Sequence, residues 1–579
     1  MIEPRYLAVL DPRHSGAAEA LAGGRPGAIP LEPFHRSARM TVLTAPGTPA
    51  LIGEDGGILI GRLFRKSRSG AIDTLAPSIA ATRGQALIDD YWGDYVCLLE
   101  PPGGSGLVAI RAPSGMLQAF RIRRGPVTYL VSHIEIALDY GLIAPVIDWQ
   151  FVAHHLAFLH LRTARTGLAR VDEILPGEAL ETGGAASTRR GLWSPWRFAA
   201  PERRIVAADK AAQIVSDAVR AAVENLVSPM ERVLLELSGG LDSSLLAAAL
   251  SQAGRTVVAL NLSTPDPGAD ERDYARAIAG HCGIALHEAR ISDDIDLTMQ
   301  VSSLLARPGL PAMLHSADRR FEALAREQEA AAFVSGTGGD CVFCSLGSAT
   351  PATDHFRAHG PRPALVGILH DLATLHRTNI WTVTRLMMRQ IRRGKPALRW
   401  RRNTAFLAHD RLPAVPDDHP WLEEPDHVLP GTRAHVRAIM AAGAHLDGYG
   451  RQETAPSLYP LLAQPVVEAC LRIPTWLWVQ GGYDRAVARA AFRQSLPETI
   501  ATRRTKGAMD AFCARVFDAN RDRLKPFLLD GMLADAGLLD RTGIETYLAR
   551  PFGNRDAHFY ELLPIVDTEA WARGVAASA

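Results

Sequence analysis

The stretch Ser238-Gly239-Gly240-Leu241-Asp242-Ser243-Ser244 decides the fold of this chain. It follows the apolar run Val233-Leu234-Leu235-Glu236-Leu237 and precedes the apolar, Ala-rich residues 245–250, so the pattern predicts a strand, a Gly-rich turn and a helix. The two glycines let the backbone approach a ligand closely, the serines add hydroxyl groups, and the opening helix offers free amide groups to an anion. The stretch therefore predicts a phosphate-binding loop, although it lacks the lysine of the G-x-x-x-x-G-K-[ST] loop.

The pattern S-G-G-x-D-S is similar to that of the ATP pyrophosphatases, which cleave ATP between its α and β phosphates and pass AMP to a substrate. This resemblance implies that Asp242 holds Mg²⁺ against the pyrophosphate, because this cation prefers carboxylate and phosphate oxygens. The alternative is a structural Gly-rich turn between a strand and a helix. The strand–turn–helix context of the whole motif favours the nucleotide site.

Composition indicates an ordinary soluble enzyme of more than one domain. The chain of 579 residues is too long for one hydrophobic core, and it is 47% hydrophobic and 22% charged. With 63 Lys and Arg against 62 Asp and Glu, no overall basic field favours nucleic acid. No apolar run is as long as a membrane span, and the first residues lack the apolar core of a signal peptide. We therefore expect a cytoplasmic protein without a nucleic-acid or membrane partner.

The 6 cysteines are scattered along the chain and do not suggest a disulfide framework. Cys341 and Cys344 form a C-x-x-C, but no second pair exists to complete a zinc site. Two small buried thiols are the favoured interpretation.

Two domains are expected, over residues 1–198 and 199–579. The first is β-rich, because short apolar runs alternate with Gly, Pro and Ser clusters. From Ile205 onward Ala-rich helical patterns alternate with short apolar runs at residues 257–262, 285–289 and 331–335. This alternation predicts a parallel sheet with helical crossovers, followed by a helical extension.

A second Gly-rich turn, Ser335-Gly336-Thr337-Gly338-Gly339-Asp340, follows the last of these runs. The ends of parallel strands converge on one crevice. We therefore expect Asp242 and Asp340 to face the same magnesium–pyrophosphate group.

With both turns in view, the chain resembles the asparagine synthetase family, which pairs an S-G-G-x-D-S loop with a later S-G-x-G-x-D loop. The resemblance implies ATP and Mg²⁺ as cofactors, with Asp242 and Asp340 as the metal ligands. The residues that it implies for ATP binding are Leu237, Ser238, Gly239, Gly240, Asp242, Ser243, Ser244, Leu262, Ser335 and Gly336. The family usually has Glu after the second Asp, where this chain has Cys341.

The N-terminal half shows looser matches to the class II glutamine amidotransferase (Ntn) fold. They are Arg111-Ala112-Pro113-Ser114-Gly115, Trp92-Gly93-Asp94-Tyr95 and Leu175-Pro176-Gly177-Glu178. That fold uses an N-terminal Cys as nucleophile, whereas this chain begins Met1-Ile2 and its first cysteine is Cys97. We therefore expect an inactive glutaminase half and an amine other than ammonia from glutamine.

Family members without this cysteine include β-lactam synthetases, carbapenam synthetases and the cyclases of lasso peptides. Two C-terminal sequence segments are similar to those of the lasso peptide cyclases. They are Tyr459-Pro460-Leu461-Leu462-Ala463-Gln464-Pro465 and Gly481-Gly482-Tyr483-Asp484-Arg485. The alternatives are a small-molecule amide ligase of the β-lactam synthetase kind and an ammonia-dependent asparagine synthetase. A nucleotide-binding scaffold without catalysis is a further alternative.

Two candidate catalytic residues come from this resemblance. Lys506 follows Arg503-Arg504-Thr505 and would stabilise negative charge at the reacting phosphate, as a fixed cation does in a dry site. The family's carboxylate opposite the amine has no counterpart in Ala455-Pro456-Ser457-Leu458, and the nearby Glu453 is the substitute candidate. Arg485 and Arg489 share a helix face and could hold a phosphate, a peptide carboxylate or an acid such as Asp484.

The resemblance implies a two-step ligase. An Asp or Glu side chain of a precursor core peptide is adenylated with release of pyrophosphate, and the peptide's N-terminal amine then displaces AMP to close an isopeptide macrolactam. A leader peptidase and a leader-binding protein are the expected partners. The basic cluster around Trp400, which includes Arg389, Arg392, Lys395 and Arg399, is interpreted as a solvated helix face, with an acidic partner as the alternative.

Overall fold

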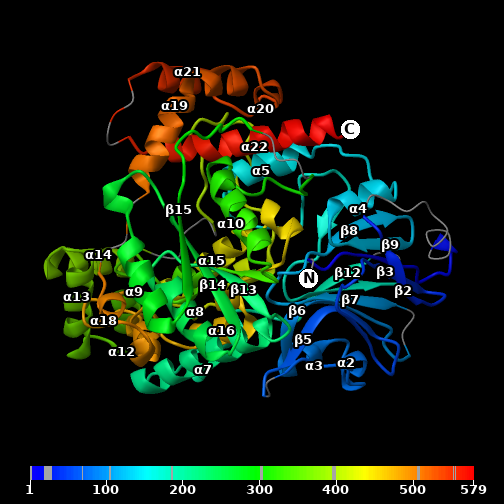
Figure 1. Cartoon of the computed structure of the whole chain (residues 1–579), viewed down its shortest axis with the longest axis horizontal. Helices are drawn as coiled ribbons and strands as arrows, with labels where there is room; N and C mark the ends of the chain where they lie inside the picture. Colours follow the sequence, from blue (N-terminus) through cyan, green and yellow to red (C-terminus); the bar gives the residue numbers. More distant parts are fainter. Residues whose placement is uncertain are drawn as a thin grey trace.

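The structure, a computed structural model, describes residues 3–17, 29–67, 70–103, 106–183, 187–299, 304–393, 400–504, 507, 509–551, 553 and 556–579. An antiparallel β-rich half is followed by a parallel-sheet α/β half with many added helices (Figure 1). The expected α/β fold class is therefore confirmed. The predicted domain boundary after residue 198 falls within the short helix α6 (Trp196–Ala199) and stays a prediction.

Two six-stranded antiparallel sheets face each other in the N-terminal half, in the orders β10-β8-β9-β1-β3-β2 and β12-β11-β7-β6-β5-β4. Tyr6, Ala8 and Leu10 alternate into the core between the sheets, while Leu7 and Val9 point to the opposite, helix-covered face. The central strands are buried on both faces for this reason. The strands are β1 (Tyr6–Leu10), β2 (Glu32–Arg36), β3 (Met40–Thr44), β4 (Ala50–Ile52), β5 (Ile58–Arg65), β6 (Tyr91–Leu99), β7 (Leu107–Arg111), β8 (Phe120–Arg124), β9 (Val127–Val131), β10 (Val171–Glu173), β11 (Glu178–Thr182) and β12 (Thr188–Gly191).

The second half contains a parallel sheet in the order β15-β14-β13-β16-β17. Its strands are β13 (Arg232–Glu236), β14 (Thr256–Ser263), β15 (Ala285–Arg290), β16 (Ala332–Val334) and β17 (Ser457–Leu458). The runs predicted as strands match the first four of these, which confirms the parallel sheet. The inner strands β13, β14 and β16 are largely buried and read as apolar runs in the sequence, whereas the edge strand β15 is partly exposed and more polar.

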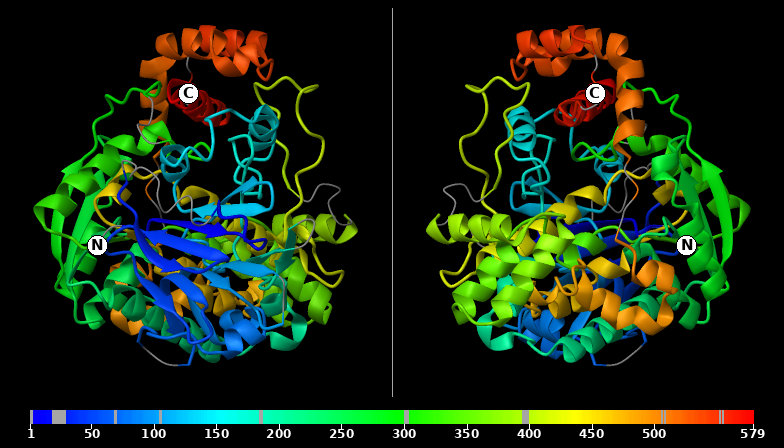
Figure 2. Two further views of the ribbon diagram at one scale, coloured as in Figure 1. Left: turned by 90° about the vertical axis from the view of Figure 1, so that its right-hand side faces the viewer. Right: turned by 90° about the vertical axis from the view of Figure 1, so that its left-hand side faces the viewer.

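Helices cover both faces of this sheet. Phe321 and Leu324 of α10 pack against Leu234 and Phe333 on one face, and Leu245 of α8 joins the core on the other. The C-terminal helices α19 to α22, orange and red, cap the top of the molecule (Figure 2). The helices of this half are α7 (Ala208–Val227), α8 (Leu241–Gln252), α9 (Arg272–Cys282), α10 (His315–Glu327), α11 (Gly339–Val342), α12 (Thr350–His359), α13 (Ala364–Leu375), α14 (Ile380–Arg392), α15 (Pro430–Ala442), α16 (Gln464–Leu471), α17 (Ala486–Phe492), α18 (Glu498–Ala501), α19 (Asp510–Leu529), α20 (Met532–Asp535), α21 (Arg541–Ala549) and α22 (Phe559–Ala577).

The helices of the first half are α2 (Ser78–Ala81), α3 (Gln85–Asp90), α4 (Ile134–Asp139) and α5 (Trp149–Ala157). Ile134 and Phe151 of α4 and α5, with Ile79 and Leu87 of α2 and α3, extend the core outside the two sheets. The N-terminal half is therefore layered as helix, sheet, sheet and helix.

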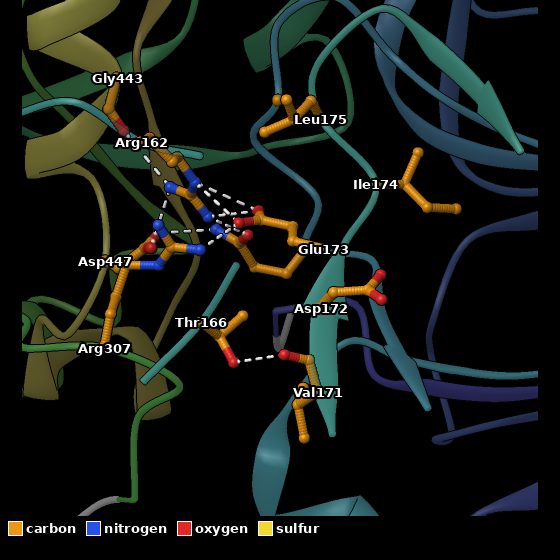
Figure 3. Close-up of polar contacts among 12 residues, drawn as sticks. Arg162, Thr166, Val171, Asp172, Glu173, Ile174, Leu175, Arg307, Gly443 and Asp447 are labelled. Carbon is orange, nitrogen blue, oxygen red and sulfur yellow. Dashed lines mark hydrogen bonds and ion pairs between the residues drawn. The ribbon is translucent and has the colours of Figure 1, made fainter. Parts of the chain in front are cut away.

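A buried ionic cluster joins the two halves (Figure 3). The carboxylate of Glu173, at the end of β10, is fully buried and receives the guanidinium groups of Arg111, Arg162 and Arg307. Arg162 also pairs with Asp447 at 2.9 Å. Because Arg307 and Asp447 come from the second half of the chain, the cluster fixes one half against the other.

Candidate functional site

The carboxyl ends of three neighbouring parallel strands carry the residues predicted to bind ATP. Leu237 follows β13, Leu262 lies in β14, and Ser335 follows β16. Since β13 lies between β14 and β16, these three positions share one edge of the sheet. This is the edge at which parallel α/β sheets bind their ligands.

The first Gly-rich loop needs glycine at one position because helix α9 comes very close. Gly239 has a positive φ of 77°, and a Cβ there would lie 2.7 Å from the backbone nitrogen of Ala275 and 2.8 Å from the Cβ of Tyr274. Beyond the loop, α8 begins at Leu241, and its first turn presents amide groups that suit an anion.

The hydroxyl groups of the loop organise its backbone. The backbone N–H of Gly240 donates to Oγ of Ser238 over 3.2 Å, and the Oγ atoms of Ser238 and Ser243 lie 3.1 Å apart. Ser244 is fully buried and its N–H donates to the carbonyl of Gly240 over 3.1 Å. Ser238 is therefore the exposed hydroxyl of the loop, whereas Ser243 and Ser244 are buried and support it.

The second Gly-rich loop packs directly on the first. A Cβ on Gly336 would lie 3.1 Å from the backbone nitrogen of Ser243, and one on Gly339 would lie 2.7 Å from Cγ of Asp242. Any side chain at Gly339 would displace the Asp242 carboxylate. The structure thus brings together the two turns that the sequence predicts to form one site.

Asp242 and Asp340 act on the same neighbouring groups. Burial raises the pKa of the Cys341 thiol to about 12, and the charges of both aspartates contribute to this rise. Burial lowers the pKa of the Arg485 guanidinium, but the charges of Asp242, Asp484 and Asp340 outweigh it and hold that pKa above its usual value. The two carboxylates therefore lie near each other. If both bound one hard cation, phosphate oxygens could take its remaining coordination positions.

Arg485 is the functional residue that sequence reasoning left undecided. One of its Nη atoms donates to Oδ2 of Asp242 over 2.8 Å, and its Nε donates to Oδ2 of Asp484 over 2.9 Å. Its backbone is left-handed, with a φ of 51°. Ser345 and Arg489 also bond to Asp484, so the Asp484 carboxylate holds Arg485 against the first loop.

Polar residues that sequence reasoning missed support the carboxyl ends of β13 and β16, where the sequence predicts the nucleoside of ATP to bind. Asn261 is buried and its side-chain amide donates to the carbonyl of Leu237 over 2.8 Å. The hydroxyl of Ser335 donates to Oε2 of Glu236 over 2.6 Å, and Glu236 is ion-paired with Arg451. Asn261 is an interruption in the apolar run of β14, which is the one signal that could have identified it.

The segment that carries Lys506 meets the first loop through its described residues. A guanidinium nitrogen of Arg503 donates to the carbonyl of Gly239 over 2.9 Å. The Cζ atom of Arg503 lies 3.8 Å from the centre of the Tyr274 ring, in a cation–π contact. The N–H of Gly507 donates to Glu271 over 2.7 Å. Lys506 itself lies outside the described residues, and its catalytic role stays a prediction.

Glu453 lies in a short 3₁₀ segment, Gly450–Glu453, between the two halves of the chain. Its carboxylate pairs with Arg5 and its side chain is 55% exposed. A cavity between the halves is lined by Glu453 and by Ser457 and Tyr459, which flank the end of β17 next to Ser335. Glu453 therefore lines a cavity near the sheet edge that carries Ser335, and its role as a base stays a prediction.

Two further motifs are the C-x-x-C and the basic cluster around Trp400. Cys344 is buried and Cys341 half-buried, both as free thiols. Trp400 is buried and its indole N–H donates to the carbonyl of Leu159 over 3.0 Å, whereas Arg389 and Arg392 are exposed on α14. Lys395 and Arg399 lie outside the described residues.

Among the residues that the structure describes, no group of three or more His, Cys, Asp or Glu side chains could hold a metal ion without added ligands. In the same part of the chain, no helix is both long enough and apolar enough to cross a membrane.

A family model described as asparagine synthase matches residues 215–573. Two solved structures share 9% and 10% identity with this chain at a TM-score of 0.20. The first, described as the allosteric regulatory enzyme of purine biosynthesis, matches over 49% of this chain and 80% of its own. The second, glutamine phosphoribosylpyrophosphate amidotransferase from B. subtilis complexed with ADP and GMP, matches over 57% and 81%. No curated protein matches the chain.

The matched region of the family model contains both Gly-rich loops, the sheet edge that they share and Arg485. The chain therefore belongs to the asparagine synthase family and is an ATP-dependent ligase of the kind that forms amide bonds.

Proposed function

We propose that this protein is an AMP-forming lasso peptide cyclase. It adenylates an Asp or Glu side chain of a precursor core peptide, and the N-terminal amine of the same peptide then displaces AMP to form an isopeptide macrolactam. The observation that carries the adenylation step is the direct packing of Gly339 on the Asp242 carboxylate, which joins the two Gly-rich loops. The sequence around Asp484 and Arg485 is similar to that of lasso peptide cyclases, which supports a precursor peptide as the substrate.

In this proposal the two loops and the sheet edge between them share the binding of Mg²⁺ and ATP. Asp242 and Asp340 hold Mg²⁺, which would neutralise the leaving pyrophosphate. The first-turn amides of α8, with Ser238 and Ser243, hold phosphate oxygens. Leu237, Leu262, Ser335 and Gly336 bind the nucleoside along the sheet edge, and Lys506 stabilises the negative charge of the reacting phosphate.

The amine comes from the peptide itself. Within residues 1–198 the sequence contains one cysteine, Cys97, in the middle of β6. It is fully buried, and burial raises the pKa of its thiol far above the usual range, so it is not a nucleophile for glutamine. In this proposal Glu453, which lines the cavity between the two halves, accepts the proton of the attacking amine.

The test is a reaction of the purified protein with ATP, Mg²⁺ and a leader-free core peptide that carries Asp or Glu near its eighth or ninth residue. The expected products are AMP, pyrophosphate and a peptide lighter by one water, measured by chromatography and mass spectrometry. AMP formed with a carboxyethyl amino acid, but not with the peptide, would instead identify a β-lactam synthetase-like ligase. AMP formed only with aspartate and ammonia would identify an asparagine synthetase.

A further inference from the structure

A groove with a volume of about 990 Å³ lies on the surface, and no residue of either Gly-rich loop lines it. Its walls are the end of β5, the segment from α6 to α7, the outer face of α7, and α16. Figure 1 shows α7, α16 and β5 side by side along the lower edge of the molecule. Since β5 belongs to the N-terminal half, both halves contribute to the groove.

The groove is strongly cationic in a chain whose net charge is only +1. Its cationic side chains are Arg65, Lys66, Arg203, Arg204, Lys210 and Arg472. Its carboxylates are Glu202, Asp217 and Glu468. Such a local excess attracts an anionic ligand and concentrates it at the surface.

Few of these cations are neutralised within the protein. Glu468 is engaged by Lys66 at 2.8 Å and by the indole of Trp193 at 3.0 Å. The other five cations form no ion pair with any described residue. Arg65 and Arg203 lie over the rings of Tyr91 and Phe198, and Arg472 donates to the carbonyl of Arg203, but none of these contacts neutralises a charge. Most of the positive charge of the groove therefore remains available to an anionic partner.

Arg204 shows the cost of this arrangement. It is half-buried, and burial lowers the pKa of its guanidinium, an effect that the charges of Asp354 and Glu202 only partly offset. A guanidinium partly removed from water gains from a carboxylate placed beside it.

Apolar groups and extended backbone lie among the cations. Arg204 and Ala207 have extended backbone, and the N–H of Ile205 between them donates to the carbonyl of Arg472 over 2.8 Å. Val206 is 64% exposed. This strip suits an extended chain that places acidic and apolar side chains alternately.

We infer that the groove binds an acidic, extended segment of a partner polypeptide. Nucleic acid fits less well, because Phe198 and Trp92, the aromatic side chains of the groove, are too deeply buried to stack on bases. This inference goes beyond the proposed function and does not rest on it, because no residue of either Gly-rich loop lines the groove.

The experiment measures fluorescence anisotropy of a fluorescein-labelled, Glu-rich peptide of about twelve residues, long enough to span about 40 Å when extended. The double variant Arg203→Glu with Lys210→Glu is compared with Arg385→Glu with Arg389→Glu, which reverses two exposed cations on α14 outside the groove. We expect saturable binding that weakens at least about tenfold in the groove variant, with a shallower salt dependence, and that is unchanged in the α14 variant. Circular dichroism and AMP release check that both variants remain folded.

Three results would overturn the inference: no saturable binding to the wild-type protein, equal binding of the same peptide with Gln in place of Glu, or equal loss in the two variants. Tighter binding of a single-stranded oligonucleotide of similar charge would reject the polypeptide as the ligand. Since the readout is binding alone, it is unaffected if the protein proves to act on another substrate.

Discussion

The buried cluster between the halves and the charged groups around the two Gly-rich loops use the same residue types in opposite proportions. In the first, three arginines surround Glu173 and Asp447, which leaves an excess of positive charge. In the second, Asp242, Asp340 and Asp484 surround Arg485 and Arg489, which leaves an excess of negative charge.

The difference separates a structural cluster from a binding site. Glu173 is fully buried and both of its oxygens are bonded to guanidinium groups, so nothing remains for a ligand. Around the loops, Asp242 and Asp340 are at least partly exposed, and both raise the pKa of a single arginine, Arg485. Their two negative charges therefore exceed its one positive charge. A divalent cation would balance this second group, whereas the first is already committed to holding the halves together.

The largest effect is expected from Glu173→Gln. It leaves three buried guanidinium groups without their carboxylate, and breaking a buried ion pair in this way costs about 3–5 kcal/mol of unfolding free energy. Chemical denaturation measures this loss. The control Glu100→Gln removes a partly exposed partner of Arg39 and should cost less than about 1 kcal/mol. Equal effects of the two substitutions would remove the distinction between the clusters.

Asp242→Asn and Asp340→Asn should affect activity and leave stability almost unchanged. Each removes one anionic ligand of the proposed metal, and loss of one such electrostatic contact reduces kcat by about 10²–10³. AMP release measures the activity, and the midpoint of thermal unfolding measures the stability. Loss of folding in either variant would show that the aspartates serve the structure instead.

Acid should weaken the structural cluster in a defined direction. Burial raises the pKa of the Glu173 carboxyl, but the charges of Arg162, Arg307 and Arg111 outweigh it and hold that pKa well below its usual range. Because the folded pKa is depressed, this carboxylate contributes stability that is present above its ordinary pKa of about 4.3 and is lost as the pH falls below it. The difference in unfolding free energy between wild type and Glu173→Gln should therefore shrink as the pH falls from about 5 to about 2. A constant difference would contradict this assignment.

Arg485→Ala should change two affinities in opposite directions. Arg485 contacts the Asp242 carboxylate and competes with a metal ion for it, so without nucleotide the variant should bind Mn²⁺ about tenfold more tightly. ATP should bind more weakly, because the variant lacks a cation near the phosphates. Electron paramagnetic resonance of Mn²⁺ and calorimetry with ATP measure the two changes. Arg489→Ala is the matched control, because Arg489 contacts Asp484 but makes no bond to Asp242. Weaker Mn²⁺ binding to Arg485→Ala would show that Arg485 supports the metal site instead of competing for it.

The smallest effect is expected from Cys341→Ser. Burial raises the pKa of the thiol to about 12, so the thiol is protonated at neutral pH and is a poor nucleophile. The rate of AMP release should change by less than about twofold. A substitution of one small side chain by another of similar size, at a position that is not fully buried, usually changes the unfolding free energy by no more than about 0.5 kcal/mol. A large loss would give Cys341 a role in place of the Glu that the family usually has there.

The sheet and its two loops could be predicted because their signals are local. Apolar runs, paired glycines and the following helix patterns lie within a few residues of one another, and parallel strand order then brings Ser238 and Ser335 to one edge. The contact between Arg485 and Asp242 could not be predicted, because it joins residues 243 positions apart in sequence. The same holds for Arg307 and Glu173, whose pairing depends on how the two halves pack. Spacing reveals which residues could pair, whereas tertiary contacts decide which of them do.

The role of Glu453 illustrates the same limit. Its position just before Ala455, where the family carries a carboxylate that this chain lacks, made it a candidate base. The structure adds a pairing with Arg5 from the other half of the chain. No local pattern could have indicated this partner.

The most direct test of the central claim, adenylation at the two glycine-flanked aspartates, uses a peptide whose acceptor carboxylate carries ¹⁸O. Attack of that carboxylate on the α phosphate leaves one of its oxygens on the phosphate when the amine displaces it. We predict that mass spectrometry finds the label in AMP, and that the labelled AMP disappears with Asp242→Asn. Label in inorganic phosphate together with ADP would contradict the account.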